Sequence, residues 1–310
     1  ITEAKGLGDY GFWMDADEEL VLKDTFNKTI FSQFLATSKL DQFQILCYYG
    51  GMNYFRSQFY SLSHDFYWYG PVHEVLKSDT PIKTGQFDFG HMKITPDGNS
   101  WKTDDLSKKY QDHAEILLKY QEDNDWKDSR WTFYLAQSYK DASNIRLGKD
   151  PKDELGIKLA KKAIQYFTER VKVNSGFYQE TFYSQLMLAR QSFHTNTDEF
   201  VFQNLIKCEE LNVDKRVEHL FNIGSFLQNS QLHKNALMYL KIALKYLKEG
   251  TKASLFKEQY IYDWAIYDMY AISLFYTGNP QDALKYFKYA LKKAENANAR
   301  DIDLERVRNN

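Results

Sequence analysis

The chain contains few of the residues that mark a special compartment or partner. It has only two cysteines, Cys47 and Cys208, in 310 residues, which are too few and too far apart for a disulfide framework or a cysteine zinc site. The formal net charge of −2 gives neither the basic surface of a nucleic-acid binder nor a basic membrane-facing patch. No apolar run approaches the roughly 20 residues that span a bilayer. We therefore expect no transmembrane segment, no nucleic-acid partner and a reducing, cytoplasmic location.

Proline is also scarce, with five residues, whereas hydrophobic residues make up 43% of the chain and aromatic residues 16%. This composition is sufficient for a packed core. The residue pattern of the sequence changes near residues 105–128. Before this point, short β-prone runs are broken by Gly, Pro, Asp and Asn, with helical candidates at 24–38 and 104–122. After it, apolar residues recur three and four apart, which predicts a nearly all-helical part.

The helical part repeats itself. "ALMYLKIALKYL" at 236–247 and "ALKYFKYALKKA" at 283–294 share one pattern at an offset of 47, and "GIKLAKKAIQYF" at 156–167 matches the first. Each follows an aromatic-rich helical segment. A further pair of segments, "GFYQETFYSQLMLARQSF" and "DEFVFQNLIKCEEL", lies between them. Helix pairs at such spacing are typical of tetratricopeptide-like repeats, so we expect four degenerate pairs. Alternatively, the aromatic residues and alanines of these segments serve packing alone.

A cluster of acidic residues ends the first aromatic run. In "FWMDADEEL", four carboxylates follow Met14 within five positions. If Tyr10 to Met14 is a buried strand, Asp15 and Asp17 lie just beyond its carboxyl end, where open α/β sheets place their ligands. Residues two apart in extended chain project to one side, and paired carboxylates suit Mg²⁺ or Mn²⁺. Alternatively, the cluster is a solvated turn before the helix that begins near Asp24.

Five segments in a fixed order carry a family resemblance. They are "DYGFWMDADEEL", "YYGGMNYFRSQFYSL", "FYWYGPVHEVL", "GHMKI" and "RWTFYLAQSYKDA". Their order resembles that of family two glycosyltransferases with tetratricopeptide-like helices behind the catalytic domain, including bacterial enzymes that add sugars to the lipopolysaccharide core. The resemblance covers residues 1 to about 145. It implies an α/β plus all-α fold, in which a partial GT-A (Rossmann-like) sheet domain precedes a tetratricopeptide-like α-solenoid.

The resemblance also implies roles for individual residues. Asp15 and Asp17 would hold Mn²⁺ or Mg²⁺ and the diphosphate of a nucleotide-sugar donor, most simply a UDP-sugar. His91 would complete the metal shell, or it has a structural role in a hairpin. His73 and Glu74 would lie in the acceptor pocket. An inverting sugar transfer needs a base and a counter-charge on the leaving group.

Glu74 is the candidate base because apolar neighbours can desolvate its carboxylate, and His73 is the reserve. Alternatively, Glu74 is a surface carboxylate paired with Lys77. Trp68 is a candidate for stacking on a sugar ring, although it also fits a core position. Arg56 faces phosphate in the same hypothesis, or it pairs with an acid.

The expected domains are 1–105, the C-terminal part of a GT-A domain; 106–128, a linking helix; 129–298, the helical repeats; and 299–310, a charged tail. The resemblance implies that the donor-binding start of the family's domain is missing, so that this chain would begin mid-domain, either because it is truncated or because its donor site is degenerate. The first hypothesis is a metal-dependent glycosyltransferase acting on a glycan, a lipid-linked acceptor or a protein. The alternative is a non-catalytic tetratricopeptide-type protein-binding module with a remnant sheet. A third is a scaffold that self-associates through its repeats.

Overall fold

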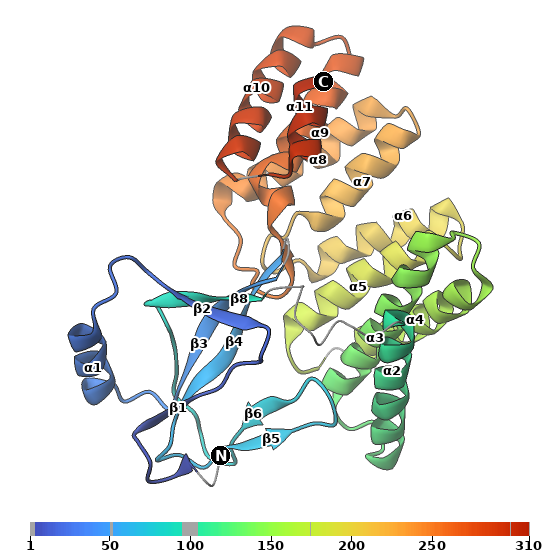
Figure 1. Cartoon of the computed structure of the whole chain (residues 1–310). Helices are drawn as coiled ribbons and strands as arrows, with labels where there is room; N and C mark the ends of the chain where they lie inside the picture. Colours follow the sequence, from blue (N-terminus) through green and yellow to red (C-terminus); the bar gives the residue numbers. More distant parts are fainter. Residues whose placement is uncertain (1–3, 50–51, 95–104, 174, 298, 310) are drawn as a thin grey trace. The chain divides into compact units, whose positions relative to one another are not determined.

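The computed structural model describes residues 4–49, 52–94, 105–173, 175–297 and 299–309. It divides into two compact units (Figure 1). Unit 1 comprises residues 1–127 together with Ser254–Phe256, and unit 2 comprises 128–253 and 257–310. A sheet lies in unit 1 and a long series of helices in unit 2, so the expected combination of a sheet part and a helical part is confirmed.

Unit 1 is built from short strands and two helices in its described residues. These elements are β1 (Tyr10–Phe12), β2 (Glu18–Leu22), α1 (Lys28–Thr37), β3 (Gln42–Tyr49), β4 (Met52–Ser61), β5 (Tyr67–Tyr69), β6 (Val75–Lys77), β7 (Thr84–Gln86), β8 (Gly90–Ile94) and α2 (Leu106–Asp123). The main sheet has the strand order β1-β4-β3-β8-β2, and β7 also pairs with β3. Strands β5 and β6 form a separate antiparallel ribbon.

The core of unit 1 lies on one face of β3. Phe43, Ile45 and Cys47 alternate along the strand and are fully buried, because residues two apart in a strand point to the same face. Helix α1 covers this cluster with Phe31 and Phe34, whose rings pack at its edge. The position of α1 within the expected helical segment 24–38 agrees with the sequence analysis.

The sheet is not a GT-A sheet, so that part of the expected fold is wrong. Strand pairs β1/β4, β3/β4 and β2/β8 are antiparallel, whereas β3/β8 and β3/β7 are parallel. A Rossmann-like sheet needs crossover helices between parallel strands. Here α1 is the only helix between the described strands of residues 4–94, and short turns connect most of the strands.

Unit 2 is a run of helices. Its elements are α3 (Ser129–Lys149), α4 (Glu154–Val173), α5 (Tyr178–Ser192), α6 (Asp198–Lys207), the 3₁₀ turn η3 (Cys208–Leu211), α7 (Glu218–Asn229), α8 (His233–Glu249), the short strand β9 (Lys257–Glu258), the π-helical turn η4 (Ile261–Ala265), α9 (Ile266–Tyr276), α10 (Pro280–Asn296) and α11 (Asp301–Asn309). Each helix from α3 to α10 packs against the next one in sequence. The four expected pairs are therefore α3/α4, α5/α6, α7/α8 and α9/α10 (Figure 1).

Small residues allow these helices to approach closely. On α8, Ala236 and Ala243 are fully buried. A Cβ placed on Gly224 of α7 would lie 2.8 Å from Met269 Sδ and 2.9 Å from Leu240 Cδ2, which shows how tightly α7 packs at this point. Close packing of this kind is the reason that a repeat array favours Gly and Ala at helix crossings.

The C-terminal segment, expected only as a charged tail, forms helix α11 and buries Val307. This helix packs against α10. Among the described residues, none of the helices combines the length and the apolar character that crossing a membrane requires.

Candidate functional site

The acidic cluster of the first aromatic run forms a closed turn between β1 and β2. The backbone N–H of Glu18 donates to the carbonyl of Asp15 at 3.1 Å, and the N–H of Asp15 donates to Glu18 Oε2 at 3.0 Å. Asp15 is exposed and Asp17 is half-buried, whereas Glu18 is buried. The carboxylate of Glu18 therefore points into the protein, whereas that of Asp15 lies at the surface.

Arg56 of β4 provides the positive charge for this turn. Its guanidinium forms an ion pair with Glu18, and its Nη1 lies 3.5 Å from Asp15 Oδ2. Gln58 of the same strand donates to Glu18 Oε2 at 2.8 Å. Burial lowers the pKa of Arg56, and the neighbouring charge of Asp15 opposes that effect. The carboxylates of Asp15 and Glu18 thus have a counter-ion within the protein.

Two tryptophans complete this group. The guanidinium of Arg56 lies 4.8 Å from the ring centre of Trp13, in the geometry of a cation–π contact. Trp13 makes an edge-to-face contact with Trp68 of β5 at 5.0 Å, and Trp68 remains 44% exposed. The structure therefore brings three of the predicted site residues, Asp15, Arg56 and Trp68, into one neighbourhood.

The other predicted residues belong to two different sets of contacts. His73 and Glu74 are exposed and directly precede β6. The ring of His73 lies 5.9 Å from that of His113 on α2. Burial, followed by the charge of Lys109, lowers the pKa of His113, and Glu74 opposes this effect only in part. Both side chains therefore lack the buried, apolar surroundings that the sequence analysis expected around Glu74.

His91 lies on β8 and makes an edge-to-face contact with Tyr48 at 5.0 Å. Within the part of the chain that the structure describes, no group of three or more His, Cys, Asp or Glu side chains comes together as a metal site would require. The Mn²⁺ or Mg²⁺ ion and the roles of the individual residues stay predictions of the sequence analysis.

The residues that the sequence analysis missed are Trp13, Glu18 and Gln58. Glu18 stands in the quoted acidic run, and its hydrophobic neighbours on β2 were a signal for inward orientation. However, its partners Arg56 and Gln58 are 38 and 40 residues away. Only the pairing of β4 with β1 brings them to the turn.

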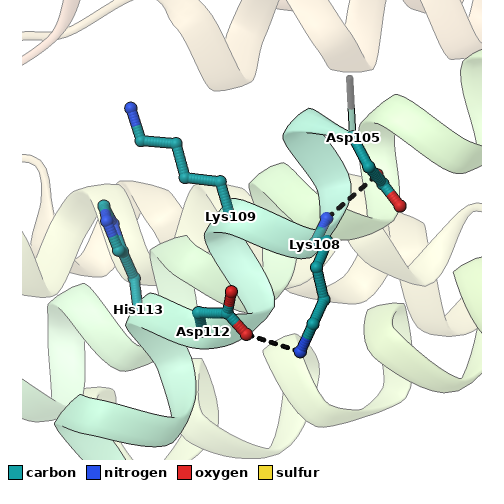
Figure 2. Close-up of a pocket in the computed structure, with 5 residues that line it drawn as sticks. All are labelled: Asp105, Lys108, Lys109, Asp112 and His113. Atoms are coloured by element: carbon teal, nitrogen blue, oxygen red, sulfur yellow. Dashed lines mark hydrogen bonds and ion pairs between the residues drawn. The ribbon is translucent and has the colours of Figure 1, made fainter. Parts of the chain in front are cut away.

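An open pocket of about 420 Å³ lies at the start of α2. Figure 2 shows its lining, with Lys109 and His113 one turn apart on the same side of the helix. Asp105 caps the helix by accepting from the N–H of Lys108 at 3.0 Å. The side chain of Lys108 forms an i,i+4 ion pair with Asp112 at 2.5 Å. These pairings occupy the two carboxylates of the pocket, so we assign no ligand to it.

Buried carboxylates at the start of α5 and α7 form ion pairs within unit 2. Glu180 of α5 lies between Arg170, at 3.3 Å, and Arg130, at 3.5 Å. Glu218 of α7 pairs with Arg216 at 2.6 Å, and both side chains are almost fully buried. A buried charge is tolerated only when it is paired and hydrogen-bonded. These pairs therefore belong to the packing of the repeats.

The inner side of the second helix pair is covered by the chain itself. Every residue of α5 except Tyr178 and Arg190 is buried. Part of the cover is the connector between α8 and α9, whose Lys252 carbonyl accepts from Gln179 at 3.4 Å. In the same connector, Glu258 forms an ion pair with Arg190 at 2.6 Å. This side of α5 is therefore filled by protein.

The outer sides of α8 and α10 are exposed and basic. We define the outer basic face by its exposed residues, which are Met238, Lys241, Ile242, Lys245, Lys288, Tyr289 and Lys292. Helix α8 carries four lysines and one glutamate, and α10 carries four lysines and two acidic residues. Because the whole chain has a net charge of −2, this concentration of lysine is local.

No protein-family model matches the chain, and no curated protein matches it either. Several solved structures are similar to it. The MamA protein is 16% identical over 62% of this chain and 94% of its own, with a TM-score of 0.33. BtubC (BKLC) from P. vanneervenii is 12% identical over 66% and 81%, with a TM-score of 0.49. A TPR protein from Thermus thermophilus, TTC0263, is 18% identical over 65% and 89%, with a TM-score of 0.36.

Of these three, TTC0263 is a tetratricopeptide-repeat (TPR) protein, and the low identities and TM-scores give no information on function. The prediction of a family two glycosyltransferase is wrong, because the sheet has antiparallel pairs β1/β4, β3/β4 and β2/β8 and lacks the GT-A strand order. The predicted sugar transfer is wrong as well, and the UDP-sugar donor is unsupported. The evidence for repeats in this chain is the stacking of the helix pairs of unit 2 and the recurring sequence pattern.

Proposed function

We propose that this chain is a non-catalytic helical-repeat module that binds another protein through unit 2. The proposal is the second of the functions considered for the sequence. Repeat arrays present long surfaces formed by equivalent positions of successive helices, and they use these surfaces for recognition. Four stacked pairs with matching packing residues form such an array.

The observation that carries the proposal is the apolar content of the outer basic face. Met238 is 65% exposed, Ile242 39% and Tyr289 44%. Exposed apolar side chains among charged residues are a common feature of protein-binding surfaces. The inner side of α5 is filled by the protein, whereas these outer positions are accessible.

A site-specific crosslinking experiment tests this function. The photoreactive amino acid benzoylphenylalanine replaces Met238 in the full-length chain, and the protein is irradiated in an extract of its source cells. We expect discrete adducts with another protein. The matched control carries the same group at Ile30 of α1, which is 58% exposed in unit 1 and should give no such adduct.

Three results would count against the proposal. They are the absence of adducts from Met238, equal adducts from both positions, and an adduct with a second copy of the chain only. Loss of the adduct when Ile242 is changed to serine would support it further, since this change removes apolar surface and leaves the charge intact.

A further inference from the structure

We propose that the outer basic face binds an acidic segment of its partner in which Asp or Glu residues alternate with apolar side chains. This inference rests on the proposed function and adds the chemical class of the partner. Its basis is a short pattern that occurs twice. Residues 241–245 read "KIALK" and residues 288–292 read "KYALK", at the repeat offset of 47.

The pattern divides each helix into a buried and an exposed side. Ala243 and Ala290 are fully buried, whereas the lysines and the apolar residue that follows the first lysine are exposed. Residues four apart lie one turn apart on the same side of a helix. Each helix therefore presents two lysines in a column with one apolar side chain beside them.

Most lysines of this face have no carboxylate partner among the described residues. Within the described residues, Lys241, Lys288 and Lys292 form no ion pair with a carboxylate, and Lys245 approaches Glu249 only to 3.8 Å. A partner carboxylate can pair with Lys241, Lys288 or Lys292 without displacing an ion pair within the described residues. Complementary charge of this kind raises the association rate and fixes the register of the partner.

The pattern favours a protein segment over a membrane surface. A helix that lies in a membrane interface buries a continuous apolar side. On α8 the continuous apolar stripe, Ala236, Leu240 and Ala243, is already buried inside unit 2. The exposed side offers single apolar residues separated by lysines, which suits side chains of a partner that alternate in the same way.

Helix α4 provides control positions for an experiment on the patterned helices α8 and α10. Helix α4 is the equivalent second helix of the first pair, and its Lys158 and Lys161 are exposed. The residue after Lys161 is Lys162, so α4 lacks the apolar member of the pattern. The same charge reversal on α4 therefore serves as a control for general electrostatic effects.

The test measures fluorescence anisotropy of a labelled peptide with three Glu-Leu-Ala-Ala-Glu units, added to the full-length chain. We expect binding that weakens about tenfold in the variant with Lys241→Glu and Lys245→Glu, since each exposed pair contributes up to about 1 kcal/mol. Lys288→Glu with Lys292→Glu should have a similar effect, and Ile242→Ser should weaken binding without a charge change. Lys158→Glu with Lys161→Glu should change the dissociation constant less than about twofold.

Circular dichroism and thermal unfolding establish that each variant is folded. Equal binding of a scrambled peptide with contiguous acids, or equal weakening by the α4 control, would overturn the inference. So would binding to phosphatidylserine-containing vesicles that depends on Lys241 and Lys245 while the peptide does not bind. If Met238 crosslinks a partner but the peptide does not bind, this inference fails and the proposed function stands. If Met238 crosslinks nothing, the proposed function fails.

Discussion

Single buried carboxylates determine much of the internal organisation of the helical repeats. Glu218 has no exposed surface, and it accepts hydrogen bonds from Arg216 and, at 2.6 Å, from Tyr262. Burial alone would raise the pKa of Glu218, but the charge and hydrogen bond of Arg216, with the bond from Tyr262, lower it below the usual value. The charged form of Glu218 is therefore the one that the folded protein stabilises.

This arrangement predicts a large effect for Glu218→Ala. The substitution leaves Arg216 buried without its partner, so the free energy of unfolding should fall by about 3–5 kcal/mol. Urea denaturation at neutral pH measures this change. Asp282→Ala, which removes an exposed pair with Lys285, is the control and should have little effect. A small loss for Glu218→Ala would show that the pair is not needed for stability.

The same carboxylate gives a pH dependence with a defined sign. Because its folded pKa is lowered, Glu218 contributes stability above its unfolded pKa of about 4.3 and loses that contribution as the pH falls further. The stability of the wild type should therefore decrease more steeply below about pH 4.3 than that of Glu218→Gln. Urea denaturation at a series of acidic pH values measures both slopes, and parallel slopes would contradict the prediction.

At the residue scale, the sequence indicates which charged residues have a role more clearly than it indicates which residues they contact. Arg56 was expected to face phosphate or to pair with an acid, and the structure pairs it with Asp15 and Glu18. Which carboxylate of the acidic run turns inward depends on the pairing of strands that lie far apart in the sequence. No local pattern contains that information.

At the scale of secondary structure elements, the close approach of crossing helices determines which positions require a small residue. Gly224 faces Met269 and Leu240 at distances that leave no room for a methyl group. Gly148 at the end of α3 has nothing within 4 Å of the equivalent position. These two helical glycines therefore have opposite requirements.

We expect Gly224→Ala to lower the free energy of unfolding by about 1–3 kcal/mol through overpacking. Gly148→Ala should raise it by up to about 1 kcal/mol, because alanine is the better helix former. Thermal and urea unfolding of both variants check the prediction. Stabilisation by both substitutions would mean that α7 can move away from α8 and α9 without cost.

The helices were predictable and the sheet topology was not. Apolar periodicity and the recurrence at 47 residues are local signals, and they located all four pairs. The β-prone runs of the first part of the chain were also recognised. Their arrangement was expected to be Rossmann-like, but it depends on which strands pair, and antiparallel pairing of β4 with β1 and β3 produced a different sheet.

At the scale of the whole molecule, charge is distributed unevenly. The chain has a net charge of −2 and a pI of about 6.4, yet α8 and α10 carry eight lysines against three acidic residues. A local concentration of one sign can attract a charged surface although the net charge has the opposite sign.

The chain should therefore be retained on a sulfonate cation exchanger at neutral pH and low salt. Lys241→Glu with Lys245→Glu should elute at clearly lower salt than Lys23→Glu with Lys28→Glu, which makes the same charge change at exposed positions of unit 1. Elution of both variants at the same salt concentration would contradict a localised basic face.

The connector between α8 and α9 supplies residues to the packing of unit 1, although it lies late in the sequence. Three of its residues, Ser254–Phe256, belong to unit 1, where Phe256 contacts the ring of Tyr54 at 5.8 Å. Cleavage of the polypeptide after Lys127 would not separate two self-contained pieces, since the first piece would lose an aromatic anchor to the second. A sheet part that ended at Lys127 would therefore lack one of the aromatic contacts of its own unit.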